Sequence, residues 1–125
     1  MLSDLLIEPD SLVAVPGGLR LGLRLPWYQS LPLSVIRLVE LSVDAVPVCL
    51  EKVYFTLNGL TRPLTDLPEL TGEFWFVTDT LQVEMPFDGA HPDTEHVCAV
   101  RMTFFPPYAE TLRRDNAGQM RMRAS

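Results

Sequence analysis

The chain has little of what membrane proteins and most enzymes require. Its 125 residues include only two histidines, and no apolar run approaches the roughly 20 residues that span a bilayer. The N-terminal segment contains Asp4 and has neither a basic stretch nor a small-residue cleavage site, so no secretory signal is predicted. We therefore expect a cytoplasmic protein without a membrane partner.

Cysteine is also scarce, with only Cys49 and Cys98. Both lie in apolar, strand-like stretches, where a thiol behaves as a small hydrophobe. A disulfide is not expected in the cytoplasm, and neither cysteine has the neighbouring histidine and positive charge that activate a catalytic thiol. The sequence predicts two buried, unreactive thiols.

Common catalytic motifs are missing as well. There is no Gly-x-Ser-x-Gly elbow, phosphate loop, dinucleotide fingerprint or Cys-x-x-Cys pair. The acidic residues Glu40, Glu51, Glu73 and Glu84 stand singly beside apolar residues, which is typical of strand residues that face water. Any two of them could form a glycosidase-like pair, because the sequence does not give their separation.

One short segment contains both histidines together with acidic residues that could bind a metal. His91, Asp93, Glu95 and His96 offer nitrogen and oxygen ligands, but their spacing is not one of the recurrent metal-site spacings. His91-Pro92-Asp93 is typical of a turn. We favour a solvated hairpin tip over a metal site, and we expect no cofactor in this chain.

The net charge of −6 is unevenly distributed. Residues 1–112 hold 6 Lys and Arg against 15 Asp and Glu, whereas residues 113–125 hold four Arg against one Asp. An acidic body would repel phosphates, so nucleic acid is excluded as a partner. The basic end, by contrast, has two interpretations: a disordered terminus, or an arm that docks on an acidic partner.

The patterns that are present indicate strands. Apolar and polar residues alternate, or strand-forming residues dominate, over residues 19–25, 35–43, 53–57, 74–77, 81–85 and 95–105. Asn58-Gly59 predicts a hairpin with a type I′ turn, and residues 65–70 predict one helical turn. Most of the 11 prolines fall between the strands.

These patterns predict an all-β fold: a single antiparallel β-sandwich, jelly-roll-like, over residues 1–108. Residues 109–125 are expected to form a C-terminal tail, either flexible or docked on a partner.

The most informative segment places Trp27 and Tyr28 between Pro26 and Pro32, directly after a strand. Prolines stiffen the loop, so both rings should be held with little entropy left to lose. Such a loop suits contact with a protein partner or a planar ligand. The alternative is that the tryptophan folds back over the end of the core.

Phe74, Trp75 and Phe76 form a second aromatic cluster. Side chains on a strand alternate between its two faces, so at least one of these rings should point away from the core. Outward aromatic rings on a β-sandwich suit a sugar platform or a protein interface. Alternatively, a loop or the opposite sheet covers them.

Several segments together resemble the small β subunit of bacterial C-glycoside deglycosidases. They are LPWYQSLPLS at residues 25–34, VYFTLNG at 53–59, PLTDLPEL at 63–70, and Trp75-Phe76. The resemblance covers roughly residues 1–108, and the proline–aromatic loop is its most specific part. The tail has no counterpart in this pattern.

The resemblance implies a β-sandwich that pairs with a larger α subunit in a hetero-oligomer of carbohydrate metabolism. That α subunit is expected to be a TIM barrel that holds a divalent metal, Mn or Mg, and the acid–base residues. The complex would act as a lyase on the C–C bond between a 3-oxo sugar and an aromatic aglycone. Trp27, Tyr28, Phe74 and Trp75 would contact the partner or border the substrate pocket.

Two other functions remain open from the residues. A free-standing carbohydrate-binding module would stack the same aromatic rings on sugars and would bind glycans alone. An independent enzyme would use His91, His96 and nearby acids.

Overall fold

The computed structural model describes residues 6–105 and 113–125, and strands dominate it. The larger of its two main sheets has five antiparallel strands in the order β1 (Val13–Val15), β2 (Gly18–Arg24), β9 (Thr80–Pro86), β6 (Tyr54–Leu57) and β7 (Leu60–Pro63).

The second main sheet has four antiparallel strands, in the order β11 (Arg114–Arg123), β10 (Glu95–Phe104), β4 (Ile36–Val43) and β5 (Val46–Pro47). Two very short strands, β3 (Leu31–Pro32) and β8 (Phe74–Trp75), pair separately. Three 3-10 turns complete the described elements: η2 (Leu33–Val35), η3 (Leu50–Lys52) and η4 (Leu64–Glu69).

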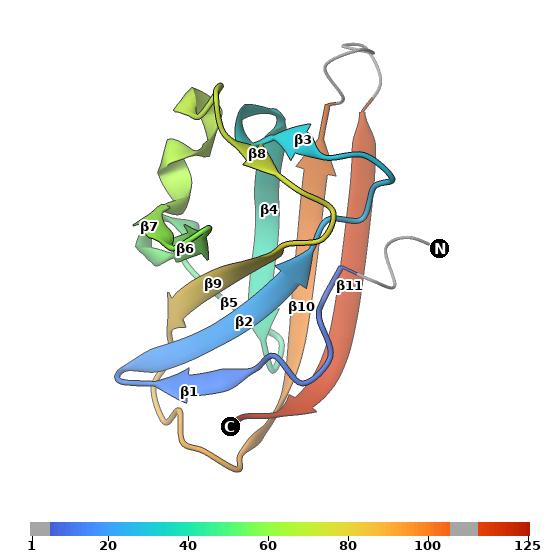
Figure 1. Ribbon diagram of the computed structural model, residues 1–125. Coiled ribbons are helices and arrows are strands. Elements are labelled where there is room, and N and C mark those ends of the chain that lie inside the picture. The colour runs from blue at the N-terminus through green and yellow to red at the C-terminus, as the bar shows by residue number, and fades with distance from the viewer. Residues whose placement is uncertain (1–5, 106–112) are drawn as a thin grey trace.

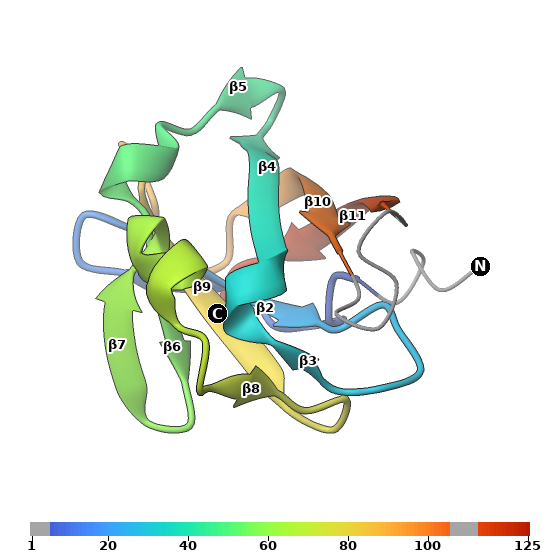
Figure 2. The same ribbon diagram turned by 90° about the horizontal axis from the view of Figure 1, so that it is seen from above.

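The two main sheets pack against each other, with the strands of one crossing those of the other obliquely (Figure 1). Seen from above, η3 and η4 lie on one side of β4, and β10 and β11 lie on the other (Figure 2). One apolar core fills the space between the sheets, and its largest side chains are Trp75, Phe55 and Phe104. The prediction of an all-β, antiparallel fold is confirmed. None of the helical turns in the described residues is long and apolar enough to cross a membrane.

Strand β2 shows how the sequence pattern becomes packing. Leu19, Leu21 and Leu23 are fully buried, while Arg20 and Arg24 alternate with them and form ion pairs with Glu84 and Glu8. Alternate side chains of a strand point to opposite faces, so one face of β2 joins the core. Burial of each leucine stabilises the fold by roughly 1.5–3 kcal/mol.

Two tight turns fix the register of the hairpins. Asn58 and Gly59 both have positive φ, at 54° and 80°, and join β6 to β7 as predicted. Asp44 and Ala45, at 52° and 67°, join β4 to β5. Positive φ is unfavourable for Ala45, and a side-chain contact of Asp44 described below compensates for it.

The expected C-terminal tail is wrong for residues 114–123, which form β11 instead. Every residue of β11 is paired with β10, from Phe104↔Arg114 to Glu95↔Arg123. The side chains of Met122 and Ala124 are buried in the core. This end of the chain therefore belongs to the sandwich, and the boundary predicted after residue 108 falls among residues 106–112, outside the described residues.

A candidate contact surface at one end of the sandwich

The two aromatic segments predicted from the sequence lie side by side. Strands β3 and β8 pair directly, with Leu31↔Trp75 and Pro32↔Phe74 in register (Figure 1). The amide N–H of Val77 donates to Ser30 Oγ at 3.2 Å. Residues 27–32 and 74–77, more than 40 positions apart in the sequence, therefore form one end of the sandwich.

Within this surface, Trp27 has a mixed role. Its ring packs edge-on against buried Phe104, with centroids 5.2 Å apart, and lies 4.8 Å from the ring of Tyr28. The Arg114 guanidinium carbon lies 5.5 Å from the centroid of the Trp27 ring, within cation–π range. Trp27 is thus partly buried over the end of the core, while Tyr28 beside it is 64% exposed.

The cluster Phe74–Phe76 follows the alternation expected of a strand. Phe74 and Phe76 are 43% and 50% exposed, with ring centroids 6.4 Å apart, whereas Trp75 between them is fully buried. The Trp75 indole N–H donates to the carbonyl oxygen of Asp79 at 3.0 Å. The outward ring predicted from the sequence is confirmed, but Trp75 as a contact residue is wrong because its side chain belongs to the core.

We define the aromatic surface as Tyr28, Phe74 and Phe76, together with partly buried Trp27, whose ring contacts that of Tyr28. Large rings in water are costly, and Trp and Tyr are among the residues most enriched where proteins bind each other. Strand pairing and Pro32 restrict the backbone here, so binding would order few further degrees of freedom. A contact role for Trp27, Tyr28 and Phe74 stays a prediction.

Two buried hydrogen-bond donors at this end have no partner within residues 6–105 and 113–125. They are Trp27 Nε1 and Asn116 Nδ2. Asn116 lies two residues after Arg114 on β11, so both side chains are on the same side of the sheet as Trp27. Buried polar groups are nearly always hydrogen-bonded, so these two donors are exceptions within the described residues.

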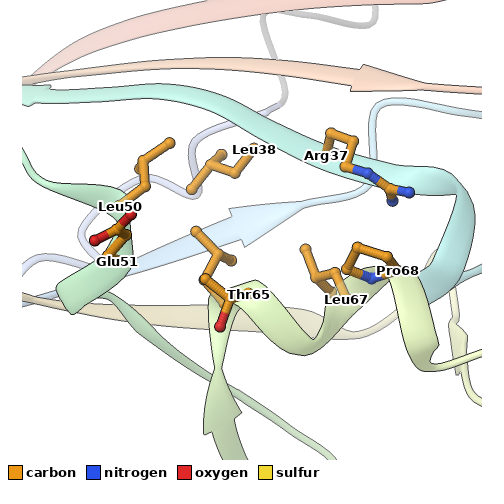
Figure 3. A pocket seen from close by; sticks show the side chains of 8 residues that line it. Arg37, Leu38, Leu50, Glu51, Thr65, Leu67 and Pro68 are labelled. Atoms are coloured by element: carbon orange, nitrogen blue, oxygen red, sulfur yellow. The ribbon is translucent and has the colours of Figure 1, made fainter.

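An apolar groove lies between β4 and the turns η3 and η4. Its volume is about 270 Å³, and Leu38, Leu50, Leu67 and Pro68 line it, with Arg37 and Glu51 toward opposite ends (Figure 3). The Arg37 guanidinium donates to the carbonyl oxygens of Ser34 and Ile36, both at 2.8 Å. Sequence reasoning missed this groove because three separate segments build it.

In the histidine segment, His96 is hydrogen-bonded within the fold. His96 is 8% exposed, with Nδ1 at 2.7 Å from Asp44 Oδ2 and Nε2 at 3.0 Å from Thr94 Oγ1. Within residues 6–105 and 113–125, no three His, Cys, Asp or Glu side chains are grouped to hold a metal. The predicted solvated turn is confirmed at His91, Pro92 and Asp93, which are exposed and lead into β10, and His96 on that strand is buried beside Phe87.

Asp44 connects the β4–β5 turn to β10. Its Oδ1 also accepts the amide N–H of Val97 at 2.9 Å. The hydrogen bond with His96, and then that from Val97, lower the pKa of the Asp44 carboxyl below its ordinary value. These contacts hold the turn with positive φ at Asp44 and Ala45.

Three of the four single carboxylates named in the sequence analysis form ion pairs, and the fourth lies beside the apolar groove. Glu84, Glu73 and Glu40 form ion pairs with Arg20, Arg62 and Arg101, respectively. Glu51 lies at the rim of the apolar groove.

The two thiols differ, contrary to expectation. Cys98 is buried, and desolvation raises its pKa to about 11. Cys49 is exposed because it precedes the 3-10 turn η3 at the surface and lies outside the strands.

Comparison with known proteins decides the family. The family model of the C-glycoside deglycosidase beta subunit matches residues 6–108. The chain belongs to this family. The resemblance predicted from the proline–aromatic loop is thus confirmed, over nearly the same residues.

Curated relatives agree over most of their length. A C-glycoside deglycosidase beta subunit of Arthrobacter globiformis is 31% identical over 111 residues, covering 89% of this chain and 85% of the relative. One from Microbacterium trichothecenolyticum is 31% identical over 129 residues, covering 99% and 98%. A 3'-dehydrocarminate deglycosidase beta subunit of a Microbacterium species is 29% identical over 125 residues, covering 98% and 95%. Their names imply a partner subunit.

Proposed function

We propose that the chain is the accessory subunit of a heteromeric C-glycoside deglycosidase, and that a larger TIM-barrel subunit carries the catalytic groups and a divalent metal, Mn or Mg. One observation carries this proposal: a domain of the C-glycoside deglycosidase beta subunit family presents rigidly held aromatic rings to solvent. Rings held in this way suit docking on another polypeptide.

The reaction requires a base and a metal, and we assign both to the larger subunit. A C-glycoside has no oxygen at the bond to its aglycone, so a general acid has no leaving oxygen to protonate. A 3-oxo group acidifies the C2 proton, which a base of the larger subunit could remove, and a divalent metal held there would supply charge stabilisation for the enolate. The C1=C2 double bond then forms as the bond from C1 to the aglycone breaks, and the released aglycone carbon takes up a proton.

In this scheme, the chain contributes a contact surface for the larger subunit and no catalytic group. Tyr28 and Phe74, supported by Trp27, dock on the larger subunit or border its aglycone pocket. Truncation of an interface anchor to alanine typically costs more than about 1 kcal/mol of binding free energy, or more than about fivefold in affinity.

The test is co-expression with a neighbouring gene that encodes a sugar-isomerase-like barrel, followed by sizing and a 3-oxo-C-glycoside cleavage assay. Wild type should co-elute with the barrel and support turnover, and Tyr28→Ala should weaken both. Val46→Ala is the matched control, because Val46 is 59% exposed on β5, at the far end of β4 from β3. It should behave as wild type.

Two results would contradict the proposal. In the first, the chain never associates with the barrel and instead binds glycans by itself, as a carbohydrate-binding module would. In the second, the isolated chain cleaves substrate, and His96→Ala abolishes that activity.

A further inference from the structure

The edges of the two main sheets differ sharply in how they are protected. Three of the four edge strands are short: β5 has two residues and includes Pro47, β1 has three, and β7 has four and ends at Pro63. Short strands and prolines are common ways to prevent unwanted pairing at a sheet edge. β11 has ten residues and no proline.

The printed hydrogen bonds show which way the backbone of β11 points. The Ala124 N–H donates to the Thr94 carbonyl, toward β10, whereas the Ser125 N–H donates to the Leu12 carbonyl on the opposite side. Backbone direction alternates along a strand, and the β10–β11 register is unbroken. Odd-numbered residues 115–123 therefore direct their N–H and C=O groups outward.

This outer edge is open within the part of the chain that the structure describes. Strand β11 pairs there with β10 alone, and it lies at the margin of its sheet (Figure 1). Among the described residues, the backbone donors and acceptors at positions 115, 117, 119, 121 and 123 thus have no strand partner on this side. An edge of this kind is a template for one further strand.

The charge of β11 indicates what kind of strand would pair with its outer edge. β11 carries Arg114, Arg121 and Arg123 against Asp115, on a chain whose net charge is −6. Arg121 forms an exposed ion pair with Glu95 at 3.2 Å, and the Arg123 guanidinium donates to the Asp93 carbonyl at 2.7 Å, so the strand keeps a modest positive charge. A second copy paired antiparallel about Gln119 would place Asp115 opposite Arg123, but each strand would still bring a net positive charge, so an acidic strand complements the edge better than a second copy does. An acidic extended segment would complement this charge.

We propose that the outer edge of β11 receives an extended, acidic segment of the larger subunit as a fifth strand of this sheet. The inference rests on the proposed function, since it requires a larger subunit. It assigns the basic C-terminal end the docking role that its charge suggested, as part of a strand and not as a flexible arm.

Residue-resolved amide hydrogen exchange tests this directly, with the full chain measured alone and in complex with the larger subunit. Outward amides of Ala117, Gln119 and Arg121 should exchange quickly in the free chain and slow at least about tenfold in the complex. Inward amides of Gly118 and Met120 should be protected in both states. This odd–even contrast distinguishes strand addition from general burial of the surface.

A proline pair supplies the matched perturbation. Gln119→Pro removes an outward N–H and leaves the bonds to β10 intact, so affinity for the larger subunit should fall at least about tenfold. Thr61→Pro is the control on edge strand β7. Leu57↔Leu60 closes the two-residue turn, so the Thr61 N–H also points outward. The affinity of Thr61→Pro for the larger subunit should stay within about twofold of wild type. Thermal melts should show that both variants are folded.

Each outcome has one meaning. If wild type and both variants assemble equally, and the outward amides stay unprotected, the inference is overturned while the proposed function stands. Protection that grows with the concentration of the free chain would identify a second copy as the occupant and also overturn it. If wild type never assembles, the proposed function fails, and this inference with it.

Discussion

Trp75 and Phe76 are adjacent, but substitution of Trp75 should mainly lower the stability of the fold, whereas substitution of Phe76 should mainly weaken assembly with the larger subunit. Trp75→Phe removes an indole N–H that donates to the Asp79 carbonyl and leaves space in a fully buried site. The lost hydrogen bond costs about 1 kcal/mol, and the lost packing about 1–2 kcal/mol. We expect the free energy of unfolding to fall by about 2–3 kcal/mol, which is a large share of the stability of a small domain.

Phe76→Ser is the comparison, because that ring is half exposed just beyond β8. A surface substitution of this kind should change stability by about 0.5 kcal/mol or less, yet it should weaken assembly with the larger subunit. Urea unfolding followed by far-UV circular dichroism measures both variants, and Trp75→Phe should lower the midpoint by about 1 M or more. If Phe76→Ser destabilises the chain more than Trp75→Phe does, the division into core and contact rings is refuted.

Three further predictions concern the scaffold. Gly18→Ala should lower the melting temperature sharply, since the new Cβ would lie 2.1 Å from a backbone oxygen of β9; an unchanged melt would contradict this packing. The hydrogen bonds that Asp44 makes with His96 and with the Val97 amide lower the pKa of its carboxyl. The stability that these bonds give the fold is therefore fully present above pH 3.8, the ordinary pKa of the group, and is lost as the pH falls through the lower pKa of the folded state. Urea midpoints at about pH 5 and pH 3 should therefore differ less in Asp44→Asn than in wild type; an equal difference would exclude this linkage. A thiol reagent at about pH 8 should label Cys49 in the native chain and Cys98 only after unfolding, because burial raises the pKa of Cys98 to about 11; equal native labelling would contradict its burial.

Local patterns predicted those parts of the fold that local chemistry determines. The alternation of Leu19, Leu21 and Leu23 identified β2, because one face of that strand is buried along its whole length. Asn58 and Gly59 identified their hairpin, because both residues tolerate positive φ. The same reasoning missed the Asp44-Ala45 turn, which depends on contacts with β10, distant in the sequence.

Strand β11 could not be recognised from its own residues. Its centre, Asn116-Ala117-Gly118, has low β-propensity, and its basic residues are typical of a solvated terminus. Pairing with β10 along ten residues overrides this local preference. Propensity is a weak guide wherever a long partner strand supplies the backbone hydrogen bonds.

The candidate site was predicted in part. Period-two alternation required an outward ring in the second aromatic cluster, but only the packing of the folded chain, in which Trp75 is fully buried, shows that Trp75 is the inward one. The apolar groove and the open edge of β11 arise from residues far apart in the sequence, so no local pattern could have revealed them.

The most direct test of the central claim is a turnover titration. The larger subunit is held at fixed concentration with a 3-oxo-C-glycoside, and the rate of C–C cleavage is measured as this chain is added. The account predicts negligible cleavage by this chain alone and a rate that rises to a plateau at a fixed molar ratio. Full activity of the larger subunit without this chain, or turnover by this chain alone, would contradict it.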